Sequence, residues 1–464
     1  SIENRDLLLS AQQRLEILKP FVASLTPEKV HSAFVSAWDR GHRLISVTGN
    51  LNLKTQTPES RILSSYHAAS GQPVSAFRVE KAAAFPYLDK PQKPGTVSGR
   101  SDIGKDLGIE IVQFANRVRL NLKQTDFKPN EFSMRISFGR GLAAVPPSRP
   151  GLGSALETVI NESGFGQIDS DQLSEALAGR KVRFSFQTGE NAFILSGSGH
   201  PSDAETLFQV ARHFFLDPGF RPEILALYKT RYRQEYEALS RTPDGMMQIR
   251  GSRFLAQDHP GFGLPSPDQV DALTLESLRG WISPALDAAP LEISVVGDFN
   301  PETITALAAR HLGSLAPRDP FVRDAPDSGT VGFPSGRNLE IRVKTKIDSA
   351  LVSVAFKTDD FWDIMQTRQL SVLARVFSER LRKTIREELG QSYSPYVYNR
   401  PSLIYNGYGV MHVRVNVKPG SQQVVLDTVR QIAASLEKGD ISTLETRNAL
   451  KPVLTHLKTL RQTN

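Results

Sequence analysis

The sequence contains no cysteine among its 464 residues, which excludes disulfide bonds, thiolate zinc sites and cysteine nucleophiles. It also contains no stretch approaching the roughly 20 consecutive apolar residues that a membrane helix requires, so we expect no membrane span. None of the nine histidines lies four residues from another, although that spacing places two imidazoles on one helical face around a metal ion. We therefore expect no metal cofactor in this chain.

Acidic and basic side chains are interspersed along the sequence. Lys and Arg number 56 against 49 Asp and Glu, which gives a net charge of +7. No long basic run accompanies this surplus, so it indicates a solvated surface of mixed charge and not a nucleic-acid partner. At this length we expect two or three domains, because single cores stop growing at roughly 250–300 residues.

An internal repeat organises the chain. The segment Thr26–Val30 recurs as Thr274–Leu278, and Ile45–Gly49 recurs as Ile293–Gly297, both at an offset of 248 residues. Each copy has the pattern of a capped helix followed by a buried strand that ends at glycine. A chance match of two short motifs is the alternative, but the shared structural pattern favours duplication. We expect both copies to form the same helix–strand unit, with a strand at 43–49.

The chain then divides into four segments. Only about 25 residues precede the first copy, so we expect 1–53 to be the C-terminal remnant of a preceding domain. Residues 54–108 hold five prolines and no sustained hydrophobic period, which predicts a linker. Two further domains are expected at 109–325 and 326–464. The second is expected to be truncated, because no counterpart of the Val-Val-Gly-Asp strand follows its last helix.

Strands and helices mix in both of these domains, which predicts an α+β fold. Between 109 and 325 we expect strands at about 109–112, 118–122, 182–187, 192–197 and 291–297, and helices near 153 and at 170–180, 203–216, 221–240 and from Pro301. After 326 we expect strands at 338–345, 350–357 and 411–417, a long helix that ends at Gly390, and helices at 421–437 and 441–460.

One helix carries an incomplete zinc-binding frame. Inverted zinc proteases use His-x-x-Glu-His, in which the two histidines hold the metal and the glutamate polarises its water. Here the frame is Ser154-x-x-Glu157-Thr158. Neither hydroxyl can replace a neutral imidazole as a zinc ligand. We therefore expect this chain alone not to hydrolyse peptide bonds.

Several motifs together resemble the pitrilysin/insulinase family of zinc metallopeptidases, the inverzincins. The degenerate frame lies where that family's zinc helix lies within its domain. Glu235 follows Thr158 by 77 residues, close to the family's spacing for a third ligand. The run Arg386-Glu-Glu-Leu-Gly-Gln-Ser-Tyr393 is similar to the family's C-terminal Arg/Tyr motif. The segment Val295-Val-Gly-Asp298 resembles a recurrent domain-closing strand.

The resemblance implies four related α+β domains in two halves that close like a clamshell around a peptide or small protein substrate. Their sheets are antiparallel or mixed and are packed with helices. This chain corresponds to the C-terminal, non-zinc half of a large bacterial member. The implied partner is an N-terminal half that holds zinc, on the same polypeptide or as a separate subunit. The implied location is the periplasm, with the cytoplasm as the alternative.

The resemblance also assigns roles to Arg386 and Tyr393, which are seven residues apart. The arginine would contact the substrate backbone, and the tyrosine hydroxyl would help hold the reacting carbonyl, where donors aimed at a developing oxyanion stabilise the transition state. The alternative is structural, because an arginine in a last helical turn complements the helix dipole and a strand tyrosine often belongs to a core.

The other candidate site residues also have purely structural explanations. Without a metal, Glu157 has no water to activate, and a capping or solvated role fits it. Glu235 lies in a charge-rich helix whose solvated face explains it equally well. For the whole chain the rival hypothesis is a non-catalytic structural or binding subunit with the same fold, since fold alone does not fix function.

Overall fold

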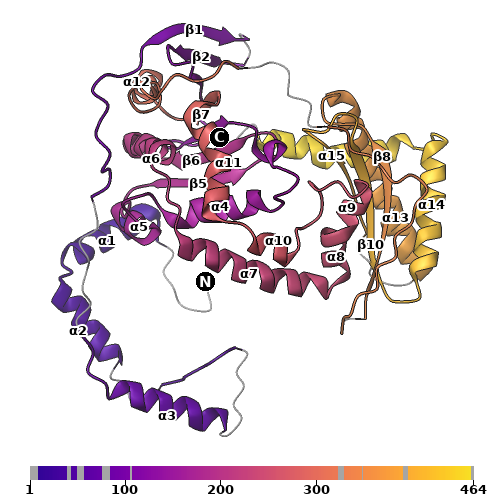
Figure 1. The fold of residues 1–464 in the computed structure, drawn as a ribbon, viewed down its shortest axis with the longest axis horizontal. Coiled ribbons are helices and arrows are strands. Elements are labelled where there is room, and N and C mark those ends of the chain that lie inside the picture. The colour runs from indigo at the N-terminus through magenta and orange to yellow at the C-terminus, as the bar shows by residue number, and fades with distance from the viewer. Residues whose placement is uncertain are drawn as a thin grey trace. The chain divides into compact units, whose positions relative to one another are not determined.

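The computed structural model describes residues 9–38, 43–49, 57–75, 84–104, 107–321, 329–346, 348–389 and 395–460. The chain forms two compact units, Ser1–Glu80 and Lys81–Asn464 (Figure 1). Among the described residues, no helix is both long enough and apolar enough to cross a membrane.

The first unit consists of three helices, α1 (Ala11–Ala23), α2 (Pro27–Trp38) and α3 (Pro58–Ser70). Local signals start two of them: Ser10 forms a capping box with Gln13, and Thr57 caps α3 ahead of its first-turn proline. None of the described residues of this unit is buried. Its helices are therefore specified by their ends and not by a core of their own.

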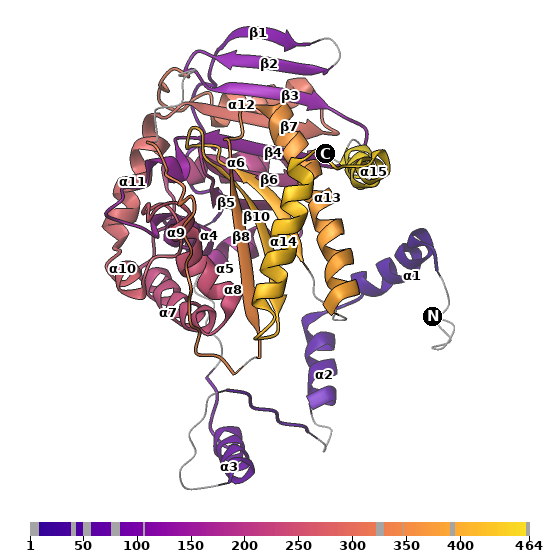
Figure 2. The same cartoon turned by 90° about the vertical axis from the view of Figure 1, so that its right-hand side faces the viewer.

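The second unit begins with a seven-stranded sheet. Its strands are β1 (Val97–Ile103), β2 (Ile109–Phe114), β3 (Arg119–Gln124), β4 (Phe132–Phe138), β5 (Val182–Thr188), β6 (Phe193–Gly199) and β7 (Leu291–Gly297). They lie in the order β1-β2-β3-β7-β4-β6-β5, which Figure 2 shows from top to bottom. Only β3 and β7 pair in parallel. Every other neighbouring pair is antiparallel.

The strands of this sheet show the burial pattern expected of strands with one face against a core, since every second residue of β4 and of β7 is buried. Its helices are α4 (Leu152–Ser163), α5 (Ser170–Ala176), α6 (Ala204–Leu216), α7 (Pro222–Ser240), α8 (Pro243–Met246), α9 (Ser252–Leu255), α10 (Pro267–Asp271), α11 (Leu275–Ala288) and α12 (Pro301–His311). Short turns of 3-10 helix occur at Gly141–Ala144 and Pro201–Asp203, and a π-helical turn occurs at Met247–Gly251. One continuous core joins the sheet to the helices.

A second, three-stranded antiparallel sheet follows in the order β8-β10-β9, formed by β8 (Ala350–Thr358), β9 (Tyr396–Pro401) and β10 (Gly409–Val417). Its helices are α13 (Ile364–Leu389), α14 (Gln422–Glu437) and α15 (Thr443–Leu460). Figures 1 and 2 both show α13 and α14 on one face of this sheet and α8 and α9 on the other. The fold is α+β, as the sequence predicts.

The expected repeat holds only for its helices. Helix α2 corresponds to α11, and Thr26 and Thr274 both accept a hydrogen bond at the start of their helix. The prediction of a strand at 43–49 is wrong, because these residues form neither strand nor helix. In β7 the same pattern is buried between two paired strands. Within the described part of 1–80 no strand pairs with 43–49, and alternation without a partner does not make a strand.

Two further predictions need correction. The expected linker 54–108 contains α3 and β1, and β1 was missed because it is exposed along its whole length and so shows no alternation. The expected strand 338–345 has no regular structure, and its side chains are mostly exposed. It has no partner strand either, since β8 pairs with β10 alone among the described residues.

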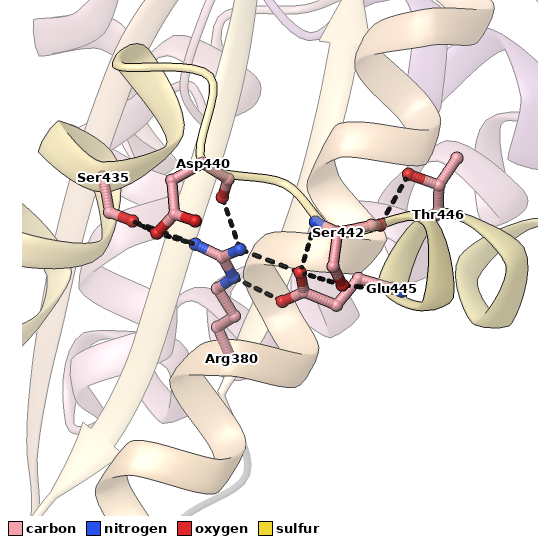
Figure 3. Close-up of polar contacts among 6 residues, drawn as sticks. All are labelled: Arg380, Ser435, Asp440, Ser442, Glu445 and Thr446. Carbon is pink, nitrogen blue, oxygen red and sulfur yellow. Dashed lines mark hydrogen bonds and ion pairs between the residues drawn. The ribbon is translucent and has the colours of Figure 1, made fainter.

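A polar network anchors α13 to the end of α14, the start of α15 and the segment between them (Figure 3). The Arg380 guanidinium donates to both carboxylate oxygens of Glu445, at 2.6 and 2.9 Å, and to Ser435 Oγ at 3.1 Å. Ser442 donates to the same carboxylate through its backbone N–H and its hydroxyl. The hydrogen bond from Arg380, followed by those from Ser442, lowers the pKa of Glu445 to about 2. Because the guanidinium bonds to both oxygens of one carboxylate, it fixes the relative orientation of the two side chains as well as their distance.

This network predicts a pH-dependent stability. The folded-state pKa of Glu445 is depressed, so its contribution is present above the ordinary carboxyl pKa and is lost as the pH falls toward 2. We expect Glu445→Gln to lower the melting temperature at pH 7, and the difference from wild type to shrink steadily below about pH 4.5. The control is Glu379→Gln, which removes an exposed ion pair with Arg382 and should change little. An equal deficit at pH 7 and pH 3 would refute the assignment.

Candidate functional site

The two sheets of the second unit contain the same four-element path. In the first sheet a strand, a helix, an edge strand and an inner strand occur in the order β4, α4, β5 and β6, with the short α5 as an additional helix before β5. In the second sheet the equivalents are β8, α13, β9 and β10, with the same strand order. Helix α4 therefore corresponds to α13, and edge strand β5 corresponds to β9. The sequence-predicted residues Ser154, Glu157 and Thr158 lie on α4, and Arg386 lies on α13.

The hydroxyls of the degenerate zinc frame bind protein atoms. Helix α4 buries Leu152, Ala155, Leu156, Val159 and Ile160, which leaves the frame on its outer side. Ser154 Oγ lies 2.7 Å from the hydroxyl of Tyr228 on α7. Thr158 Oγ1 donates to the carbonyl of Ser154 one turn earlier at 3.1 Å. Burial raises the pKa of Tyr228, so the phenol stays protonated and available for this bond.

The carboxylate of Glu157 binds the outer edge of β5. Its Oε2 accepts a hydrogen bond from the backbone N–H of Thr188 at 3.1 Å. One turn further, Asn161 donates to the carbonyl of Phe186 and accepts from its N–H, both at 2.8 Å. The amide of Asn161 thus imitates a neighbouring strand. Side chains of α4 thus hydrogen-bond to the backbone of the outer edge of β5 at 186–188.

These positions do not fit a zinc ion. Both hydroxyls and the carboxylate are engaged, and hydroxyls are poor zinc ligands in any case. Glu235 is exposed two turns beyond Tyr228 on α7 and makes no hydrogen bond to the frame. Within the described residues, no group of three or more His, Cys, Asp or Glu could hold a metal. We therefore assign no zinc-dependent chemistry to this position.

The edge of β9 differs from that of β5. Among the described residues, no side chain or backbone group bonds to the outer edge of β9, although α13 packs beside it. Arg386 lies in the last turn of α13, and its side chain is outside the described residues. Tyr393 falls within 390–394, also outside them. In chain order, this pair flanks the junction between α13 and the open edge strand.

Sequence reasoning missed Asn161 and Tyr228. Asn161 lies four residues after Glu157, so both face β5, but nothing local announces the pairing with Phe186. Tyr228 begins an aromatic series on α7, in which its ring lies 5.8 Å from that of Tyr232 and the latter 6.2 Å from that of Tyr236. Its repeat of four residues was a visible helical signal.

A known protein family matches part of this chain. Residues 272–452, from the start of α11 to within α15, match the family model described as the peptidase M16 inactive domain. This part of the chain is similar to the M16 inactive domain. The relatives of the chain include a protein described as a probable zinc protease.

Curated relatives of the M16 domain are distant and longer. A chloroplastic stromal processing peptidase from Oryza sativa subsp. indica is 20% identical over 96% of this chain and 39% of its own length. A probable zinc protease PqqL from Haemophilus influenzae is 19% identical over 85% of this chain and 42% of its own. The chain therefore spans less than half of these relatives.

Solved structures share the fold. The periplasmic protease PqqL from Escherichia coli matches with a TM-score of 0.70 at 16% identity, covering 99% of this chain and 50% of that one. A separate structure of the first half of PqqL matches with a TM-score of 0.53 at 15% identity, over 77% of this chain and 79% of that one. The same fold thus occurs in one half of PqqL taken alone.

The engaged zinc frame gives a prediction about metal. We expect the purified chain to hold no stoichiometric zinc and to leave peptides uncut, because Ser154 and Thr158 offer no imidazole and their hydroxyls are engaged. Metal analysis by plasma mass spectrometry, together with a peptidase assay, checks both points. One tightly bound zinc per chain would contradict this reading of the frame.

The hydrogen-bonded edge of β5 gives a second prediction. Asn161→Ala removes both bonds to Phe186 and should lower the free energy of unfolding by about 1–3 kcal/mol. It should also speed amide hydrogen exchange at Phe186. The control is Glu162→Ala on the same helix, which loses only an exposed ion pair with Arg231 and should cost less than about 1 kcal/mol. Equal effects of the two variants would show that the bonds between Asn161 and Phe186 do not contribute to the free energy of unfolding.

Proposed function

We propose that this chain is the non-zinc half of a zinc metalloendopeptidase and that it holds extended peptides while a zinc-bearing half cuts them. The proposal is carried by the outer edge of β9, to which none of the described residues hydrogen-bonds and which begins just after the segment containing Tyr393. An extended peptide adds to such an edge through main-chain hydrogen bonds, and this binding tolerates many sequences.

The difference between the two equivalent edges supports this placement. On β5, Asn161 and Glu157 already occupy the groups that a peptide would use at Phe186 and Thr188. Beside that strand, the space between α4 and α5 is a cavity of about 110 Å³, large enough only for a few waters. The first sheet then serves as chamber wall, and the second sheet receives the peptide.

The chemistry divides between the halves. Zinc in the other half supplies metal-assisted attack by water on the scissile carbonyl. On this chain, Arg386 binds the peptide backbone, and the hydroxyl of Tyr393 donates to the carbonyl oxygen as negative charge develops there. The bonds between Arg380 and Glu445 hold α13 in place and so keep Arg386, six residues further along the helix, in a constant position beside β9.

The partner and the compartment belong to the same proposal. PqqL is a periplasmic protease, one half of which is covered by this chain, and its first half has been solved as a separate piece. We infer that a zinc-bearing half of the same fold completes this chain, as part of one polypeptide or as a subunit. The two halves enclose the peptide like a clamshell, and the enzyme works in the periplasm.

Substitution of the Arg/Tyr pair in the assembled enzyme tests this function. Tyr393→Phe should preserve the fold and the zinc content and lower kcat roughly 10²–10³-fold with little change in KM, because an oxyanion donor acts mainly in the transition state. Arg386→Ala should also raise KM, since a ground-state contact to the peptide is lost. Arg386→Lys should rescue little if the planar guanidinium is needed.

The matched control is Arg382→Ala, which lies on the same helix with an exposed side chain paired to Glu379 and should leave kcat and KM unchanged. Normal kinetics for folded Tyr393→Phe and Arg386→Ala would assign the pair to packing. That result would favour the rival function, a non-catalytic structural or binding subunit.

A further inference from the structure

One face of the second sheet carries aromatic and basic side chains beside a small apolar cluster that includes Val410, Ala355 and Leu255. Alternate residues of a strand point to opposite faces, and Val397, Val413 and Val415 belong to the core under α13 and α14. Their neighbours therefore point away from those helices. We call this set the tyrosine–arginine face: Tyr396, Tyr398, Arg400, His412 and Arg414.

The strand register brings these side chains into contact. Arg414 lies opposite Tyr396, and His412 lies opposite Tyr398. The rings of Tyr396 and Tyr398 are 4.9 Å apart, and the imidazole of His412 stacks on Tyr398 at 4.8 Å. The guanidinium carbon of Arg414 lies 5.8 Å from the centre of the Tyr398 ring, within reach of a cation–π contact. The face is a preformed platform and not a set of independent side chains.

Polar groups at the centre of this platform lack partners. Arg414 Nε and His412 Nδ1 are buried without a hydrogen bond, although buried polar groups in proteins are nearly always paired. His412 is only 7% exposed. Burial, followed by the charges of Arg414 and Arg400, lowers its pKa to about 4, so the imidazole is neutral at neutral pH. Because these two atoms are buried, a ligand would reach the face through the exposed side chains of Tyr396 and Arg400.

The charge of the face has one sign. Strands β8, β9 and β10 contain no aspartate or glutamate. Lys357 lies on the same face, opposite Val410, which is itself opposite Arg400. One carboxylate approaches from the first sheet: Glu190 lies 3.8 Å from Arg400, whose side chain stays 72% exposed. The three strands therefore carry a surplus of positive charge, which complements an anion.

We propose that the tyrosine–arginine face binds acidic residues of the peptide substrate. It adjoins the outer edge of β9, because Tyr396 begins that strand and is 62% exposed. A peptide paired along the edge presents alternate side chains toward this face, where carboxylates meet Arg414 and Arg400 and the chain packs on the tyrosines. This inference rests on the proposed function and adds a substrate class to it: peptides rich in aspartate or glutamate.

Peptide binding to the 464-residue chain tests the proposal. The probes are a fluorescently labelled peptide of alternating glutamate and valine and its glutamine–valine counterpart, with binding followed by anisotropy. We expect the glutamate peptide to bind about tenfold more tightly or better, as for charge-assisted hydrogen bonds, and the difference to shrink at high salt. Equal affinities would overturn the proposal. A single-stranded oligonucleotide that displaces the glutamate peptide and binds more tightly would also overturn it.

Variants locate the binding. Arg400→Gln and Tyr396→Ser change exposed side chains. Arg400→Gln should weaken binding of the glutamate peptide several-fold and leave the glutamine peptide unaffected, whereas Tyr396→Ser should weaken binding of both peptides, because both pack on the ring. The control is Arg430→Gln on α14, which removes an equally exposed charge paired with Asp427 and should change nothing. Melting temperatures confirm that the variants are folded. Unchanged affinity in both folded variants would overturn the assignment to this face.

Failure of this proposal is distinguishable from failure of the proposed function. If Tyr393→Phe impairs kcat but the enzyme shows no preference for acidic peptides, the face is wrong and the function stands. If acidic peptides bind through Arg400 and Tyr396 while Tyr393→Phe is fully active, the face is right and the catalytic role fails.

Discussion

Hydrogen bonding at the sheet edges is the constraint on which this account depends. An edge strand leaves a row of backbone N–H and C=O groups that must be paired, covered or left to solvent or a partner. Strands β5 and β9 occupy equivalent edges of the two sheets. Asn161 and Glu157 bond to β5 at Phe186 and Thr188, whereas none of the described residues hydrogen-bonds to the outer edge of β9, although α13 packs beside it. Among the described residues, the two copies of the fold therefore differ in the hydrogen bonding of this edge.

The helices beside these edges, α4 and α13, also differ in whether their side chains bond to the neighbouring edge strand. On α4, the hydroxyl of Ser154 contacts Tyr228 and the carboxylate of Glu157 holds the neighbouring strand, so the residues of the Ser-x-x-Glu-Thr frame stabilise the fold. On α13, a network around Arg380 fixes the helix from outside the sheet, and no described side chain of this helix bonds to the edge of β9.

The parts of the fold that the sequence predicted are those with strong periodicity of their own. Strands such as 291–297 and 411–417 alternate cleanly, and α13 and α14 repeat at helical spacing. The strands expected at 43–49 and 338–345 failed because a strand also needs a partner, which no local pattern supplies. Strand β1 was missed because it is exposed throughout. In the site, the loss of zinc ligands was visible in the sequence. The bonds from Asn161 to Phe186 and from Ser154 to Tyr228 were not, since they join residues 25 and 74 positions apart.

The most direct test of the central claim is amide hydrogen exchange of the assembled enzyme, with its zinc removed by chelation so that an added peptide stays intact. Pairing of the peptide with an edge strand slows exchange of the backbone amides of that strand. The account predicts slower exchange in β9 when peptide is present and no change in β5. Protection of β5, or of neither strand, would contradict it.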